Sequence, residues 1–68
     1  MIDLSILTPG LAVRHIRTGR DYRVVKHTLA RQGDGLWVPS INYVPANGSD
    51  GDYTRDIATF CENFEVAP

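Results

Sequence analysis

Cysteine is nearly absent from this chain, and so is any long apolar run. Cys61 is the single cysteine, which excludes a disulfide within the chain, and no Cys/His spacing resembles a zinc site. No stretch is apolar enough to span a membrane, and the start MIDLSILTPG lacks the basic beginning of a secretion signal. We therefore expect a cytoplasmic protein with no membrane contact, no metal site and no cofactor.

A surplus of charge of one sign is also missing. The net charge is −1 over 68 residues, which argues against a strong nucleic-acid binder. The halves nonetheless differ: residues 1–31 hold six Lys or Arg against two acids, a net +4, and residues 32–68 hold one Arg against six acids, a net −5. Such a chain pairs head to tail with itself, presents one basic and one acidic face, or brings opposite charges together within the fold.

The small size of the chain limits its stability. A domain near this length buries only about 60% of the surface that its unfolded form exposes. Domains of this size usually depend on disulfides, a metal or a partner subunit. With the first two excluded, good packing or self-association remains.

Basic residues recur at every third position in VRHIRTGRDYRVVK. In a helix this spacing would spread them around about two-thirds of the cylinder, because each residue advances about 100°. A central glycine and several β-favouring residues also argue against a helix. The segments LAVRHIR and YRVVKHTLA are instead predicted to form a β-hairpin with Gly19-Arg20 as a two-residue turn, in which Arg17 faces Tyr22.

Both faces of this hairpin would carry apolar residues. Three of them suit the core: Val13, Tyr22 and Val24. Three others would lie on the reverse face and would need cover: Ile16, Val25 and Leu29. Residues 1–9 form an N-terminal segment in which IDLSI alternates apolar and polar residues. This segment is expected to be an extra strand that covers the reverse face or pairs with a second copy.

The rest of the chain is predicted to hold three further strands. LWVPSINYV is extended, and Pro39 marks a bend, a bulge or a sheet edge, because proline cannot donate to a ladder. The polar loop PANGSDGD is followed by a short strand YTR, one tight turn capped by Asp56, and a last strand FCENFEV. We predict an all-β fold in which residues 10–68 form a small Src-homology-3-like barrel of five antiparallel strands, with one short 3-10 turn before the last strand. A plain open antiparallel sheet is the alternative.

The segment PGLAVRHIRTGRDYRVV resembles the opening of the short bacterial and phage proteins grouped as domain of unknown function 1653. The shared residue types fall on Gly10, Val13, His15, Gly19, Tyr22 and Val24. INYV at 41–44 is similar to that family's central strand. GDYTRDIATF is similar to its closing element, with Tyr53 in place of tryptophan and Asp56 in place of proline after Arg55. The resemblance covers roughly residues 10–64, departs in the loop at 45–52, and implies an Src-homology-3-like barrel of bacterial or phage origin without an assigned activity.

Aromatic residues and one arginine are the candidate binding residues, because such side chains dominate interface energetics. The candidates are His15, Tyr22, Trp37, Tyr43, Tyr53 and Arg55. His15 and Tyr22 lie on neighbouring predicted strands and would form a recognition pair, unless the histidine is a hydrogen-bonded structural residue. Trp37 and Tyr43 would otherwise be core residues.

Two functions are compatible with these features. The first is a non-enzymatic binding module that acts through protein–protein contacts and self-associates as a homo-oligomer. The second is binding of nucleic acid or a nucleotide, in which Arg14, Arg23 and His27 on the outer hairpin face contact phosphate and aromatic rings stack on bases. An enzyme is not expected, since no nucleophile site or acid–base pair can be assembled from the sequence.

Overall fold

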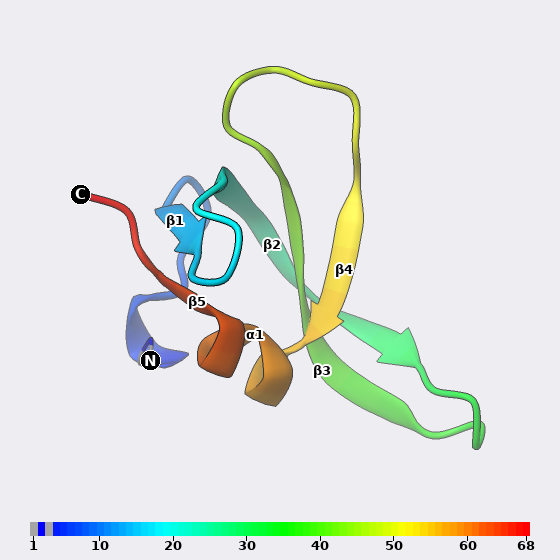
Figure 1. Cartoon of the computed structure of the whole chain (residues 1–68). Helices are drawn as coiled ribbons and strands as arrows, with labels where there is room; N and C mark the ends of the chain where they lie inside the picture. Colours follow the sequence, from blue (N-terminus) through cyan, green and yellow to red (C-terminus); the bar gives the residue numbers. More distant parts are fainter. Residues whose placement is uncertain (1, 3) are drawn as a thin grey trace.

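Five strands, one α-helix and one 3-10 turn make up the computed structural model, which describes residue 2 and residues 4–68 (Figure 1). In chain order they are η1 (Leu4–Ile6), β1 (Ala12–His15), β2 (Asp21–Arg31), β3 (Trp37–Pro45), β4 (Tyr53–Asp56), α1 (Ile57–Asn63) and β5 (Phe64–Val66). The strands form a single antiparallel sheet with the order β4-β3-β2-β1-β5. The predicted all-β class is confirmed, with one short helix added.

The sheet is open, so the prediction of a closed barrel is wrong and its alternative is confirmed. β4 and β5 end the strand order, and no ladder joins them in the described part of the chain. A seven-residue α-helix takes the place of the expected 3-10 turn between them. Asp56 caps this helix by accepting a hydrogen bond from the Thr59 N–H at 3.0 Å. After the helix, β5 pairs with β1 and forms one edge of the sheet. Strand β4 forms the other edge.

The β1–β2 hairpin is confirmed, but its turn is longer than predicted. Val13, and not Arg17, pairs with Tyr22. Because this register differs from the prediction by an even number of residues, the side chains of β1 and of β2 up to Val24 keep their predicted faces. Val13 is therefore buried in the core and Tyr22 packs against it.

Local hydrogen bonds explain the longer turn. The Nδ1 atom of His15 accepts a hydrogen bond from the Thr18 N–H at 3.3 Å, and the His15 carbonyl accepts one from the Gly19 N–H at 2.8 Å. Gly19 has a φ of 72°, a left-handed conformation that glycine adopts without steric cost. The turn therefore closes at His15, ahead of the predicted position.

A β-bulge at Val25 interrupts the pairing of β2 with β3. Val24 pairs with Tyr43 and Lys26 pairs with Asn42, so Val25 has no partner in the ladder. An extra residue of this kind bends the strand and reverses the alternation of its side chains. Beyond the bulge, β2 and β3 continue as a two-stranded ribbon that projects past β4 (Figure 1).

Pro39 lies at the sheet edge that the sequence predicts as one of three possibilities. It pairs with Leu29 on β2, whereas the ladder between β3 and β4 begins only at Ser40. Proline is tolerated at this position because the outer side of β3 has no ladder there to break. Strand β3 therefore runs through Pro39 without interruption.

The core lies where the sheet, α1 and the N-terminal segment meet. Its buried members are Ile2, Leu7, Val13, Val24, Ile41, Tyr43, Phe60, Cys61 and Phe64. Phe60 from α1 and Phe64 from β5 stack with ring centroids 4.2 Å apart. The predicted core residues Val13 and Val24 are confirmed, and the helix supplies a part of the core that the hairpin alone does not contain.

The N-terminal segment contributes to the core through a turn, and the predicted strand is wrong for residues 4–6, which form η1. This turn allows Ile2 and Leu7, which flank it, to be buried to 4% and 1% exposure. The Ile2 N–H also donates to the Cys61 carbonyl at 3.3 Å. Residue 3 of the predicted strand lies outside the described residues.

The reverse face of the hairpin is not covered by this segment. The three apolar side chains predicted to lie there are exposed: Ile16, Val25 and Leu29. The bulge at Val25 moves Leu29, like the other residues that follow it, to the opposite face of β2. Pairing of the N-terminal segment with a second copy stays a prediction.

Candidate binding groove

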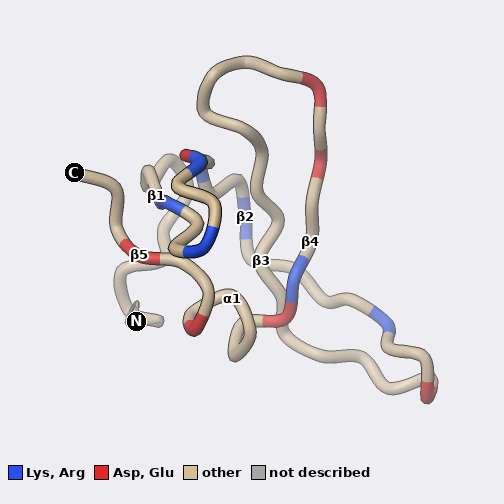
Figure 2. Tube along the Cα trace, viewed as in Figure 1, with Lys and Arg blue, Asp and Glu red and all other residues tan. Residues whose placement is uncertain are grey.

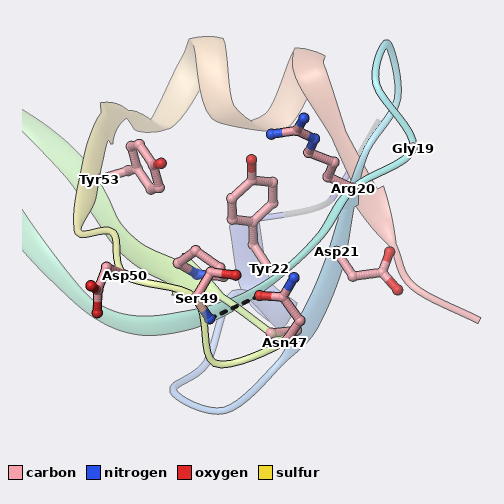
Figure 3. A pocket seen from close by; sticks show the side chains of 10 residues that line it. Gly19, Arg20, Asp21, Tyr22, Asn47, Ser49, Asp50 and Tyr53 are labelled. Atoms are coloured by element: carbon pink, nitrogen blue, oxygen red, sulfur yellow. Dashed lines mark hydrogen bonds between the residues drawn. The ribbon is translucent and has the colours of Figure 1, made fainter.

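A groove of about 800 Å³ lies where the β1–β2 turn approaches the β3–β4 loop (Figure 3). Its lining includes Arg20, Tyr22, Pro45, Asn47, Asp50 and Tyr53. The start of β2 brings these segments together, because Tyr22 pairs with Val13 on β1 and with Pro45 on β3. Loops that are distant in sequence therefore form the two walls of one groove.

Two tyrosines form the apolar floor of the groove. Tyr22 comes from β2 and Tyr53 from β4, and their rings meet edge to face with centroids 5.9 Å apart. Tyr43 on the intervening strand β3 contacts both, at 5.4 Å from Tyr22 and 5.5 Å from Tyr53. Edge-to-face and offset-stacked rings are the favourable arrangements for aromatic side chains. The floor is thus a packed aromatic surface supported from below.

The floor continues into the core through further aromatic contacts. Tyr43 contacts Phe60 at 5.2 Å, and Tyr22 contacts Phe64 at 5.7 Å. His15 meets the Phe64 ring edge to face at 5.0 Å. This chain of contacts holds the two groove tyrosines in fixed positions.

Gly51 approaches the Tyr53 ring closely. A Cβ atom built on Gly51 would lie 2.9 Å from Cε2 of Tyr53 and 3.1 Å from its hydroxyl oxygen. Real Cβ atoms do not come this close to other atoms, so any other residue would displace the ring. The absence of a Cβ atom at Gly51 therefore leaves the space that the Tyr53 ring occupies.

Side-chain amides hold the β3–β4 loop in shape. Oδ1 of Asn47 accepts a hydrogen bond from the Ser49 N–H at 2.9 Å (Figure 3). Nδ2 of Asn42 donates to Oδ1 of Asp52 and, at 3.0 Å, to the Tyr53 carbonyl. The wall of the groove is therefore anchored both within the loop and to β3.

One ion pair removes a charge from the lining of the groove. Nε of Arg14 donates to Oδ1 of Asp21 at 2.8 Å, and the two residues are directly paired on β1 and β2. The hydrogen bond from Arg14 lowers the pKa of Asp21 below 3.8. Asp21 is thus a carboxylate whose charge is already balanced within the chain.

Burial is the main cause of the shifted pKa of Tyr43. Desolvation raises its pKa above 10.0, and the hydrogen bond and positive charge of Arg55 partly offset the rise. Arg55 stands opposite Ile41 on the same side of the sheet as Tyr43. The Arg55 guanidinium therefore forms a hydrogen bond with Tyr43 from the edge strand β4.

The structure brings together three of the six candidate binding residues. Tyr22, Tyr43 and Tyr53 form the floor and its support, so the expectation that Tyr43 is a core residue holds as well, at 7% exposure. His15 reaches the cluster only through Phe64 and has hydrogen bonds with Thr18, which fits the structural alternative.

The other two candidates lie apart from the groove. Trp37 is on the ribbon beyond the bulge and is 61% exposed, so it does not close the core. Arg55 contacts Tyr43 and also lines a second hollow of about 280 Å³ beside Arg31 and Asp56.

The three residues of the nucleic-acid alternative already have partners within the chain. Arg14 is bound to Asp21, and Arg23 donates to the Gly10 carbonyl at 3.1 Å. The bulge at Val25 moves His27 off the predicted outer face to the side of Ile41, where its Nε2 contacts the Leu7 carbonyl. Nucleic-acid binding stays a prediction that no contact of these residues supports.

The distribution of charge does not divide the molecule into two simple faces. Figure 2 shows cations on β1, the β1–β2 turn and β2, and acids on the β3–β4 loop, α1 and β5. The pair of Arg14 with Asp21 joins opposite charges within the N-terminal half, and Arg55 precedes Asp56 in the other. Opposite charges are therefore partly interleaved by the fold.

Eight of the ten lining residues are not among the sequence candidates, and two of them, Arg20 and Asp50, carry the groove's unpaired charges. Gly51, which follows Asp50 and approaches the Tyr53 ring, is not a candidate either. Sequence patterns place them in polar turns, and turns rich in glycine and aspartate are most often only solvated. No spacing signal predicts that the two loops meet, because the meeting depends on the register of β2 with both neighbours.

Comparison with protein-family models, with curated proteins and with solved structures found no match to this chain. No helix among the described residues is long and apolar enough to cross a membrane.

Proposed function

We propose that this protein is a non-enzymatic binding module whose groove takes an extended segment of a partner protein. The observation that carries the proposal is the pair Tyr22 and Tyr53, which form a rigid aromatic floor between two loop walls. Tyrosine offers a large apolar surface, a polar hydroxyl and few rotatable bonds, and it is enriched at binding sites for these reasons.

The shape of the groove favours an extended peptide over a small molecule. Small-molecule sites bury most of their ligand in an enclosed cavity, whereas this groove is open to solvent between the loops. Aromatic-lined grooves bind extended, proline-rich segments, because such segments are already ordered before they bind.

We extend the proposal to the fold family. Three features support an Src-homology-3-like fold with an open sheet. They are the strand order β4-β3-β2-β1-β5, the helical segment between β4 and β5, and a long, bulged β2 that lies between β1 and β3. The resemblance to domain of unknown function 1653 is supported by the use of its residues: His15 and Gly19 shape the turn, and Tyr22 forms the floor. A bacterial or phage origin and a cytoplasmic location follow from that resemblance and from the composition as parts of the proposal.

Self-association is a further part of the proposal. Leu29, Leu36 and Trp37 are 59%, 65% and 61% exposed, and the ribbon that carries them projects from the body of the protein (Figure 1). Apolar side chains that cluster on a surface are typical of protein contacts. The ribbon is therefore the surface through which copies are proposed to meet.

The groove is tested by selection from a random peptide library displayed on phage, with the folded protein immobilised. We expect enriched peptides to bind at least about tenfold more weakly to Tyr22→Ala and to Tyr53→Ala, the size of effect typical of interface hot spots. Thr54→Ala is the matched control, because Thr54 is exposed and lies on the opposite face of β4 from Tyr53. Absence of any enriched peptide, or equal binding by all variants, would contradict the proposed function.

A further inference from the structure

The groove carries one unpaired charge of each sign. Arg20 lines it from the β1–β2 turn and Asp50 from the β3–β4 loop. Figure 3 shows the two side chains toward opposite ends of the lining, with Tyr22 and Tyr53 between them. Within residue 2 and residues 4–68, neither charge takes part in an ion pair.

The remaining charge in the lining is already compensated. Asp21 forms its ion pair with Arg14 at 2.8 Å and contributes no net charge to the groove. Asp52, in the same loop, does not line the groove and accepts a hydrogen bond from Nδ2 of Asn42 instead. The groove is therefore dipolar, with a positive end at Arg20 and a negative end at Asp50.

We infer that the groove selects an extended peptide segment with an acidic side chain at one end, a basic side chain at the other and apolar residues between. The acidic group pairs with Arg20, the basic group pairs with Asp50, and the apolar residues lie on Tyr22 and Tyr53. This inference rests on the proposed function and names the class of segment that the groove takes.

The dipolar arrangement disfavours two simpler ligand classes. A polyanion such as a nucleic acid would meet Asp50 at one end of the groove, and a wholly basic segment would meet Arg20 at the other. Like charges placed against each other reduce affinity and are a common source of specificity. A segment with both charges in one fixed order avoids both penalties.

The experiment compares peptide selection on the wild type with selection on the charge-swapped variant Arg20→Glu/Asp50→Lys. Both residues are exposed, so the variant is expected to fold, which circular dichroism checks. The wild type should enrich peptides with an acid and a base in one order around an apolar stretch. The charge-swapped variant should enrich the reverse order.

A matched control separates the local effect from total charge. Arg17→Glu/Asp34→Lys makes the same charge changes at exposed positions that do not line the groove, and it should enrich the wild-type order. Defined peptides, in which glutamate and lysine flank about two to six prolines that rise about 3.1 Å each, then give the spacing. Replacement of either charged peptide residue by alanine should weaken binding by about two- to fivefold, the range for exposed ion pairs.

The outcomes distinguish this inference from the function on which it rests. Enriched peptides that need Tyr53 but show no paired charges, or charges of a single sign, would overturn the inference and leave the groove as a binding site. The same result follows if the charge-swapped variant enriches the wild-type order. Failure to enrich any peptide would overturn the proposed function itself.

Discussion

Tyr43 and Tyr53 stand directly opposite each other on β3 and β4, and their rings stack with centroids 5.5 Å apart and planes inclined by 25°. Tyr43 is 7% exposed and belongs to the core, whereas Tyr53 is 44% exposed and belongs to the groove. The binding surface is therefore a direct extension of the core. Changes at Tyr43 are expected to affect stability first, and changes at Tyr53 are expected to affect binding first.

Burial of Tyr43 predicts a loss of stability at high pH. Below pH 10 the phenol is neutral in both the folded and unfolded states. As pH rises past 10.0, the unfolded chain releases this proton first, because burial raises the pKa of Tyr43 in the folded state. The free energy of unfolding should therefore fall progressively between pH 10 and the folded-state pKa, as measured by urea denaturation.

The variant Tyr43→Phe identifies the source of this loss. Phenylalanine keeps the ring contacts and has no proton to release, so the alkaline fall in stability should be smaller than in the wild type. Tyr53→Phe changes an exposed ring and serves as the comparison. An equal alkaline fall in wild type and Tyr43→Phe would contradict the assignment.

Gly51→Ala is expected to damage the groove more than the fold. The new Cβ would lie 2.9 Å from the Tyr53 ring, which must move out of the floor. Peptide binding should weaken by about tenfold, the effect of removing the ring itself. The loss of stability should be smaller and should come mainly from the φ of 157° at Gly51, which residues other than glycine rarely adopt. The measurement is binding of library-selected peptides together with the tyrosine ring signals in NMR spectra.

The matched change for this test is Gly33→Ala in the β2–β3 turn. A Cβ built on Gly33 meets no atom within 4 Å, so this variant should bind like the wild type. Unaltered binding and unaltered Tyr53 signals in Gly51→Ala would show that the close approach has no role.

Asp56→Ala should destabilise α1 by about 1 kcal/mol, the usual cost of losing a helix N-cap. Asp56 accepts the Thr59 N–H at 3.0 Å, and this hydrogen bond lowers the pKa of Asp56 below 3.8. Its stabilisation is therefore present above pH 3.8 and is lost as pH falls through the folded-state pKa. Thermal or urea denaturation measures the difference between variant and wild type.

Asp56→Asn provides the control for the cap. Asparagine keeps an oxygen acceptor and is a good N-cap residue, so its stability near neutral pH should stay close to that of the wild type. It cannot titrate, so it should lack the acid-dependent part of the loss. Equal stability of Asp56→Ala and wild type would contradict the capping role.

Trp37→Ser tests self-association through the ribbon. The wild type should show a concentration-dependent average mass in analytical ultracentrifugation, and the variant should shift toward the monomer. Leu4→Ser removes a side chain of similar exposure, 50%, from η1 and should leave the mass unchanged. A wild type that remains monomeric at high concentration would contradict this part of the proposal.

Some of the fold follows from local pattern. Alternation of apolar residues around Gly19 predicts the hairpin and the burial of Val13 and Val24, and an even register difference leaves these faces intact. Asp56 is predicted as a cap and is one. The bulge at Val25 has no such signal, since LAVRHIR and YRVVKHTLA alternate equally well without it. It places His27 on the face opposite to the predicted one.

The aromatic composition predicts which residue types form the candidate site but not where the site lies in the fold. Tyr22, Tyr43 and Tyr53 meet because three neighbouring strands place them side by side. Trp37 lies outside this group because β3 extends beyond its ladder with β4. Arg20 and Asp50 lie in turns whose meeting depends on contacts between distant segments. Sequence patterns describe neighbours along the chain and cannot register such contacts.

The sequence alone determines the extended segments, the helix cap at Asp56 and the absence of a disulfide within the chain. Those follow from backbone preference, side-chain alternation and the single cysteine, all of which are local. Only the tertiary structure determines that the sheet stays open, that an α-helix joins β4 to β5, and that two loops flank a floor of tyrosine rings. Each of these is settled by packing between residues far apart in sequence, where burial of the core outweighs local preference.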